Sequence, residues 1–251
     1  MSNLLARRAL AELLGTAFLV AAVIGSGIAA VRLSPGAVGL ELLENSLITG
    51  GALVALILAL QPVSAAFNPV VTLVERLLGA ISTTTALALA AAQVTGGILG
   101  AIAANLMFGL PAVTIAVHPR TGAGLWLGEV VATLGLVLVI FGMARAGRTG
   151  SIGIAVGGYI TAAYWFTSST SFANPAVTIS RMFSDTFAGI SPSSAPMFIL
   201  MQLVGGLAAW LLVRALYPDA ARVAAEIVEE QPATYGASSA DRRASEPGLT
   251  R

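Results

Sequence analysis

The chain has 251 residues, of which 57% are hydrophobic and only 10% are charged, and its formal net charge is +1. Soluble domains carry about a quarter charged residues, so most of the surface of this protein is not expected to face water. The near-zero net charge argues against a nucleic-acid partner. The chain has no cysteine, which excludes disulfides, thiolate metal sites and cysteine nucleophiles.

Six apolar stretches are each long enough to cross a lipid bilayer, which requires roughly 20 such residues. They cover residues 9–31, 46–67, 84–108, 125–144, 149–174 and 195–213. The only charges inside them are Glu12 and Glu129. The sequence therefore predicts an all-α membrane protein with six transmembrane helices, whose surface partner is the lipid bilayer.

The basic residues, all of them Arg, predict how the chain lies in the membrane. A six-span chain places one group on the side of both termini: Arg7, Arg8, Arg145, Arg148, Arg214 and Arg222. The other side has Arg32, Arg120 and Arg181. Cytoplasmic connections carry the excess of basic residues, so both termini are predicted to be cytoplasmic, in the inner (plasma) membrane. Residues 219–251 are rich in Ala, Glu, Ser, Pro and Arg, and we expect a disordered cytoplasmic tail after a membrane domain of residues 1–218.

The membrane domain contains an internal repeat, in which three marks occur in the same order at about residues 6–108 and 123–217. The marks are Ala11-Glu12 and Gly128-Glu129, then Asn68-Pro69-Val70-Val71-Thr72 and Asn174-Pro175-Ala176-Val177-Thr178, then Gln93 with Gly96-Gly97 and Gln202 with Gly205-Gly206. Each half holds three spans, an odd number, so the second half must be inverted relative to the first. Inverted repeats place their functional site near the midplane, between the halves.

Each Asn-Pro motif reads as the start of a short helix, since Asn is a good N-cap and Pro is favoured at the first helical position. The segments that follow, residues 68–78 and 174–184, are too short to span a bilayer. Two half-helices entering from opposite faces would bring their positive N-terminal ends together at the centre. Asn68 and Asn174 would then offer side-chain N–H donors to a passing solute.

On these residues the chain resembles the major intrinsic protein family, the aquaporins and aquaglyceroporins, from residue 6 to about 217. The resemblance is carried by Ala11-Glu12 with Gly15-Thr16, Ser64 with Phe67-Asn68-Pro69, Ala92-Gln93 with Gly96-Gly97, Glu129, and Asn174-Pro175-Ala176. It implies the aquaporin fold, with six transmembrane helices and two re-entrant half-helices, and an aquaporin-like channel domain over residues 1–218. It further implies a passive channel without a cofactor and a homotetramer with one pore per subunit. In the family, buried glutamates such as Glu12 and Glu129 accept hydrogen bonds from the re-entrant loops, which is a structural role.

The chain departs from the family at both motifs. The first reads Asn-Pro-Val, with Val70 in place of Ala, and the second is followed by Val177 where the family nearly always has Arg. In the family that Arg and three other residues form the narrowest point of the pore. Aligned on the motifs, those three residues are expected at Thr49, Ala162 and Ser171.

All four expected constriction residues are small, and none is charged or aromatic. A pore takes its selectivity from its diameter, its lining hydrogen bonds and its electrostatic barriers. We therefore expect a wide, neutral constriction that admits water and larger uncharged solutes such as glycerol. The stretch 164–174 also resembles bacterial members that lack the Arg and occur with arsenic-resistance genes, which adds arsenite and methylated arsenicals as candidates. The sequence does not choose between these solutes.

Arg181 lies four residues beyond Val177, one helical turn further from the pore centre. Two interpretations are open. The side chain can reach the outer interface or pair with Asp185, four residues further on. Alternatively, it folds toward the pore mouth and partly replaces the missing constriction charge.

Two other classes of function compete with a channel. Secondary transporters also use inverted repeats and broken helices, but the sequence offers no ion-coupling cluster beyond Glu12 and Glu129. A membrane enzyme has less support, since no nucleophile, base and acid occur together within the spans. The single histidine, His118, lies in a polar connection, and one ligand does not make a metal site.

Overall fold

The computed structural model describes residues 3–229, and the regular structure in this range is entirely helical, which confirms the all-α prediction. The long helices are α1 (Asn3–Leu33), α2 (Val38–Leu60), α4 (Thr83–Met107), α5 (Ala123–Arg145), α6 (Ile152–Phe166) and α8 (Ala195–Leu216). The short ones are α3 (Pro69–Leu77), η1 (Thr149–Ser151), α7 (Pro175–Ser180), η2 (Arg181–Phe183) and α9 (Ala220–Glu229). Residues 230–251, the greater part of the predicted tail, lie outside the described range.

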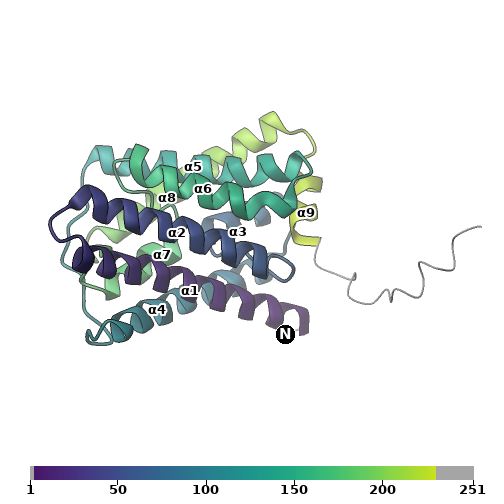
Figure 1. The fold of residues 1–251 in the computed structure, drawn as a ribbon. Coiled ribbons are helices and arrows are strands. Elements are labelled where there is room, and N and C mark those ends of the chain that lie inside the picture. Colours follow the sequence, from purple (N-terminus) through teal and green to yellow (C-terminus); the bar gives the residue numbers. More distant parts are fainter. Residues whose placement is uncertain (1–2, 230–251) are drawn as a thin grey trace, which may run out of the picture.

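The long helices form a bundle, and α3 and α7 lie inside it without crossing it (Figure 1). The N-terminus and α9 lie at one end, which we call the N-terminal end, and the opposite end is called the loop end. The packing repeats the sequence symmetry: α1 packs on α4 as α5 packs on α8, and α2 packs on α6 across the halves. Each half-helix also contacts a long helix of the other half, α3 with α8 and α7 with α4.

The predicted span at residues 149–174 is much longer than the helix that the structure has there, α6. Five helices, α1, α2, α4, α5 and α8, are long and apolar enough to cross a membrane. The stretch 149–174 forms the short η1 and the 15 residues of α6, and α6 is about 22 Å long at 1.5 Å per residue. Beyond Phe166 it continues as a mostly buried, non-helical segment that leads to the second Asn-Pro motif. Backbone of this kind is tolerated at membrane depth because it is buried in protein.

The first glycine of each Gly-Gly pair allows two helices of the same half to touch. A Cβ on Gly96 would overlap the carbonyl oxygen of Leu13 in α1, and a Cβ on Gly205 would lie 2.6 Å from that of Val130 in α5. Small residues at such places permit close backbone contact between membrane helices. The same residue type therefore fixes the α1–α4 and the α5–α8 contact.

The second glycine of each pair seats a half-helix of the opposite half. A Cβ on Gly97 would overlap the Ser180 hydroxyl of α7, and one on Gly206 would overlap the Val70 side chain of α3. Val70 is fully buried there, so its extra methyl groups fill the space beside Gly206. The departure of the first motif from Asn-Pro-Ala is thus accommodated by helix packing.

The prediction of disorder from residue 219 onward is wrong for the part that the structure describes. Residues 220–229 form α9, which packs against α5. Its buried side chains are Ala220, Val223 and Ala224, at the spacing of one helix face. The composition suggested disorder because these groups are small, but small groups are sufficient to pack against the end of a bundle.

The close α1–α4 contact gives a first prediction. A Cβ on Gly100 would overlap the carbonyl oxygen of Ala17, and backbone cannot move aside as a flexible side chain can. Gly100→Ala should lower the stability of the detergent-solubilised protein by about 1–3 kcal/mol, as overpacking does. The measurement is the loss of the monodisperse chromatographic peak after heating.

The matched control is Gly39→Ala, in the first turn of α2, where an added Cβ meets nothing within 4 Å. Alanine is the better helix former, so this variant should be neutral or slightly more stable. Equal behaviour of the two variants would contradict the role given to Gly100.

Candidate functional site

Both Asn-Pro motifs cap a half-helix in the same way. Asn68 and Asn174 have extended backbone, with φ of −152° and −156°. The Oδ1 atom of Asn68 accepts a hydrogen bond from the Val70 N–H (3.0 Å), and that of Asn174 accepts one from the Ala176 N–H (2.9 Å). Pro69 and Pro175 occupy the first helical turn, where no intrahelical donor is lost.

The two motifs are joined by a reciprocal pair of hydrogen bonds. The Asn68 Nδ2 donates to the carbonyl oxygen of Ala173 (2.8 Å), and the Asn174 Nδ2 donates to that of Phe67 (2.7 Å). Each amide thus uses one N–H to hold the opposite loop, and its second N–H is left for the cavity. We call these two bonds the reciprocal Asn bonds.

The loop residues that accept these bonds are in a strained conformation. Phe67 and Ala173 have φ of +48° and +49°, in the left-handed region that costs a residue with a Cβ about 1–3 kcal/mol. Strain of this kind persists only when neighbouring contacts hold it. Here the contacts are those of the two buried glutamates.

Glu12 receives four hydrogen bonds from the first half. Its carboxylate accepts from the backbone N–H groups of Ala66 (2.9 Å) and Phe67 (2.7 Å), from the Ser64 hydroxyl (2.5 Å) and from the Gln93 amide (2.8 Å). Glu12 is fully buried. A buried carboxylate is tolerated only with such partners, so Glu12 is bound in place to the loop.

Glu129 has the equivalent position in the second half. It accepts from the backbone N–H groups of Phe172 (2.9 Å) and Ala173 (2.9 Å) and from the Gln202 amide (2.6 Å). Gln202 also donates to the hydroxyl of Thr178 in α7 (2.8 Å), as Gln93 donates to that of Thr72 in α3 (3.0 Å). The glutamine thus ties the carboxylate, the loop and the half-helix together.

An elongated cavity runs past the motifs. At its centre lie Asn68 and Asn174. Toward the loop end its lining includes Thr49, Tyr164, Ser171, Phe172, Val177 and Arg181. Toward the N-terminal end it includes Arg8, Gln61, Val71, Glu75, Ile227 and Val228.

The two half-helices line the cavity through equivalent positions. In α3 the lining residues after Asn68 are Val71 and Glu75, and after Asn174 they are Val177 and Arg181. Offsets of three and seven fall on one face of a helix, so the face that each half-helix turns to the cavity was predictable. Sequence reasoning reached Arg181 but missed Glu75, the residue at the same offset in the other half.

Three of the four expected constriction residues line the cavity, and Ala162 does not. Thr49, Ser171 and Val177 are buried lining residues, whereas Ala162 is exposed on the outside of α6. The α6 residue at this level is Tyr164, whose hydroxyl lies 3.2 Å from the Thr49 hydroxyl. Residues two apart on a helix are separated by about 200° around its axis, so one of them must face away.

The Ser171 hydroxyl is a polar group that the protein leaves unused. Ser171 is 3% exposed and lines the cavity. Within the part of the chain that the structure describes, its Oγ has no hydrogen-bond partner. A buried hydroxyl without a partner costs free energy, which a solute in the cavity could offset by bonding to it.

Arg181 lies beside the cavity and not at the outer surface. It is 2% exposed, and its guanidinium carbon lies 3.4 Å from the centre of the Phe172 ring. Its Nε donates to the carbonyl oxygen of Ala188. The expected pairing with Asp185 is not what the structure has, because Asp185 accepts a hydrogen bond from the Val117 N–H and lies 3.9 Å from His118. The constriction region is therefore neither uncharged nor free of aromatic rings.

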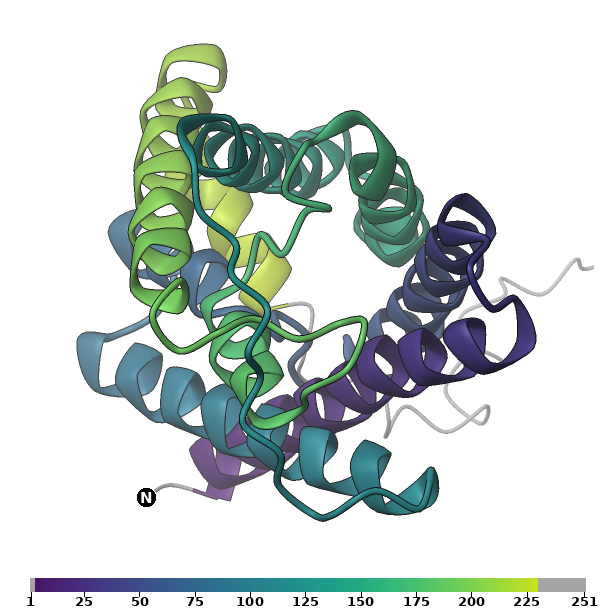
Figure 2. The same cartoon turned by 90° about the vertical axis from the view of Figure 1, so that its left-hand side faces the viewer.

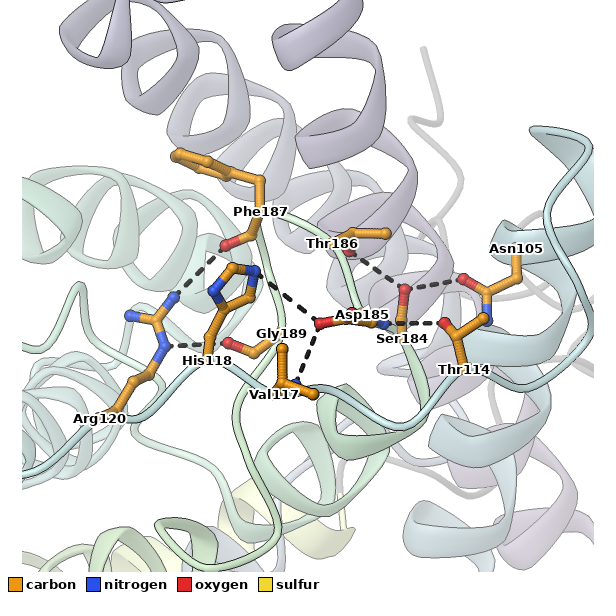
Figure 3. A network of polar contacts seen from close by, with 10 residues as sticks. All are labelled: Asn105, Thr114, Val117, His118, Arg120, Ser184, Asp185, Thr186, Phe187 and Gly189. Carbon is orange, nitrogen blue, oxygen red and sulfur yellow. Dashed lines mark hydrogen bonds and ion pairs between the residues drawn. The ribbon is translucent and has the colours of Figure 1, made fainter.

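The loops that carry these partners are held together by a polar network (Figure 3). Asp185 joins the two loops, because its N–H donates to the Thr114 hydroxyl (2.8 Å) while its carboxylate accepts from Val117. Ser184 donates to the Asn105 side chain (2.7 Å), which fixes the same loop to α4.

Arg120 completes the network on the other side of the loop. Its Nε donates to the carbonyl oxygen of Gly189 (3.0 Å; Figure 3). Its guanidinium carbon also lies 5.1 Å from the centre of the Phe172 ring. Burial lowers the pKa of Arg120 from its ordinary value, but a guanidinium remains charged in proteins. Because Gly189 adjoins Ala188, this bond helps to fix the carbonyl that Arg181 uses.

An inverted repeat, two helix N-termini joined at the centre and a cavity extending toward both ends define a membrane pore. Comparison with known proteins agrees. The sequence profile described as "Major intrinsic protein" matches residues 1–171 and 150–240. The chain belongs to the major intrinsic protein family, whose members are membrane channels and not enzymes.

Two individual proteins show how close the relationship is. The aquaglyceroporin AqpS of Rhizobium meliloti (strain 1021) is 47% identical over 217 residues, which is 86% of this chain and 92% of that protein. The X-ray structure of the aquaglyceroporin from Plasmodium falciparum superimposes with a TM-score of 0.68 at 19% identity, over 86% of this chain and 98% of that one. The second comparison establishes a shared fold. With the family known, the transporter and enzyme hypotheses are set aside.

The glutamate geometry gives a second prediction. In Glu129→Gln, the side chain has one oxygen for at least three donors, and its NH₂ group would face a backbone N–H. The buried loop then loses at least one hydrogen bond and gains a donor–donor contact, which should cost about 3 kcal/mol or more. The yield of monodisperse protein and its thermal midpoint measure the effect.

Glu44→Gln is the matched control, because Glu44 is only half-buried and accepts a bond from the Ser34 hydroxyl, which an amide oxygen can also accept. It should behave as the parent does. If Glu129→Gln is also as stable as the parent, the carboxylate is not what holds the loop.

Proposed function

We propose that the protein is a passive channel for small uncharged solutes, with water and glycerol among them. The two motifs, Asn68-Pro69-Val70 and Asn174-Pro175-Ala176, would form the middle of its pore. Glu12 and Glu129 would hold the loops that shape it, and Thr49, Tyr164, Ser171 and Val177 would line its constriction. Tyr164 thus replaces Ala162 in the proposed set.

The observation that carries the proposal is the mixed character of this lining. Val177 offers methyl groups, and Thr49 and Ser171 offer hydroxyls, of which the Ser171 hydroxyl is without a partner in the described structure. A polyol has a carbon backbone on one side and hydroxyls on the other, which suits such a wall. Arsenite in neutral water is As(OH)₃, an uncharged trihydroxy solute, and is a second candidate for the same wall.

We propose the orientation from the charges at the two ends. Besides Arg8, which is buried and lines the cavity, six arginines lie in or near connections at the N-terminal end: Arg7, Arg76, Arg145, Arg148, Arg214 and Arg222. At the loop end, Arg181 is buried beside the cavity, which leaves Arg32 and Arg120. The N-terminal end, with both termini, would then face the cytoplasm, across the inner membrane. A homotetramer with one pore per subunit is part of the same proposal, and the mass of the detergent-solubilised complex tests it.

The function is tested by stopped-flow measurements on proteoliposomes that hold the full chain. Water, glycerol, urea and arsenite are compared with liposomes free of protein. Flux that rises linearly with concentration and ignores ion gradients is expected of a channel. Glycerol and water permeabilities equal to those of empty liposomes would overturn the proposal.

Val177 supplies the third prediction. Val177→Arg should fill part of the constriction and reduce glycerol permeability about tenfold, with a smaller effect on water, because a narrower pore excludes the larger solute first. Val113→Arg is the control, since Val113 is an exposed loop residue outside the cavity lining. An equal loss for both solutes would indicate misfolding, and no loss would show that residue 177 does not limit passage.

A further inference from the structure

The buried cation of the constriction region needs an explanation. Arg181 is 2% exposed, and no carboxylate lies within ion-pairing distance of it in the described part of the chain. Placing a cation in the membrane interior is expensive, and such residues are usually functional. The residue lines the cavity, so its charge acts on whatever passes.

The surroundings of Arg181 orient its guanidinium. One face lies on the Phe172 ring, 3.4 Å from its centre, and the Nε–H is given to the Ala188 carbonyl oxygen. Cation–π contact with a ring is attractive and directional. Within residues 3–229, no protein acceptor within hydrogen-bond distance engages the Nη groups, which leaves up to four N–H donors for a solute.

We propose that Arg181 is the residue that excludes cations and binds solute hydroxyls in this pore. Val177, one turn closer to the centre, is uncharged and cannot do either. Arg181 and Ser171, whose hydroxyl is unpartnered in the described structure, both line the cavity, and a polyol carries enough hydroxyls to bond to both. The proposal rests on the channel function proposed above and adds the residue that sets its charge selectivity.

The loop network supports this role. The Ala188 carbonyl lies in the loop that Asp185, Ser184 and Arg120 fix to the rest of the loop end (Figure 3). A charge on a long flexible side chain would move aside as a cation approached. Because its acceptor and its aromatic support are both fixed, the guanidinium is preorganised at the cavity wall.

The test compares variants of the full chain in proteoliposomes by two readouts, cation conductance and glycerol flux. Arg181→Gln should raise K⁺ conductance at least about tenfold, because a fixed positive charge no longer opposes the ion. Its glycerol flux should fall by about two- to fivefold, since the amide offers fewer donors to solute hydroxyls than the guanidinium does. Arg181→Lys should retain cation exclusion. Arg32→Gln is the control, because Arg32 also lies at the loop end and outside the cavity lining.

The absence of native cysteine allows a sharper version. Arg181→Cys should leak cations, a positively charged thiol reagent should restore exclusion, and a negatively charged reagent should not. Unchanged conductance in both the Gln and Cys variants, with glycerol flux retained, would overturn the proposal. The proposal would also be overturned if the protein accumulated in the membrane only with Arg or Lys at position 181, because the role of the residue would then be structural. A parent without glycerol flux would refute the channel proposal instead.

A separate observation concerns the other end of the pore. The exit at the N-terminal end is flanked by α9, which lies across that end in Figure 1 and within the ring of long helices in Figure 2. Ile227 and Val228 of α9 line the same cavity as Ile57 and Gln61 of the α2 end. Apolar groups at a pore mouth can block it by excluding water.

From this contact we infer that α9 is an autoinhibitory lid that narrows the N-terminal mouth. Its buried side chains are Ala220, Val223 and Ala224, and Ile227 is partly buried against the same core. A contact this small stabilises the closed position only weakly, so that an open position remains accessible. The first step of opening would be the loss of the packing around Ala224.

Two identical substitutions on opposite faces of α9 test the lid. Ala224 is fully buried and Ala221 is exposed, so Ala224→Glu should release α9 and Ala221→Glu should not. Release should raise water and glycerol flux at least about threefold, because the closed population is lost. Reaction of the variant Ile227→Cys with a soluble thiol reagent reports release independently. Released α9 with unchanged flux would overturn the lid.

Discussion

The structure depends on the reciprocal Asn bonds at its centre. Asn68 bonds to the loop of the second half and Asn174 to the loop of the first, at 2.8 and 2.7 Å. The carbonyls can face the amides only because Phe67 and Ala173 adopt positive φ. Those conformations are in turn held by Glu12 and Glu129, each of which binds two backbone N–H groups of its own loop.

This chain of dependence explains why charged groups lie in the middle of a membrane protein. A neutral acceptor could bind one or two N–H groups, but a carboxylate offers about four acceptor sites. The desolvation cost of Glu12 and Glu129 is therefore offset by bonds that no neutral side chain of that size provides. Gln93 and Gln202 extend the same arrangement to the half-helices through Thr72 and Thr178.

The sequence predicted the parts of this arrangement that repeat. Apolar length predicted the spans, and the paired motifs predicted two half-helices whose first residues are Pro69 and Pro175. The symmetry also foretold the matched positions of Glu12 and Glu129. Which side chains of a long helix face the cavity is harder to predict, because it depends on the rotation of the helix about its axis. The alignment on the motifs therefore points to Ala162, whereas the α6 residue that lines the cavity is Tyr164.

Two further features, the position of Arg181 and the order of α9, could not be predicted from the sequence pattern. The position of Arg181 depends on partners from two loops, Ala188 and Phe172, whose folding no local periodicity describes. The order of α9 depends on the bundle end on which it packs, since ten residues are too few for a stable helix alone. In both places tertiary contacts, and not local propensity, determine the structure.

The reciprocal Asn bonds also bear on how the protein is made. The carbonyl of Phe67 receives its partner only from Asn174, 107 residues later in the chain. A ribosome therefore releases the first half into the bilayer with its central loop incomplete, and that loop stays without its partner until the second motif has been synthesised. Assembly of the core is then a late event in biosynthesis, and neither half can complete its fold without the other.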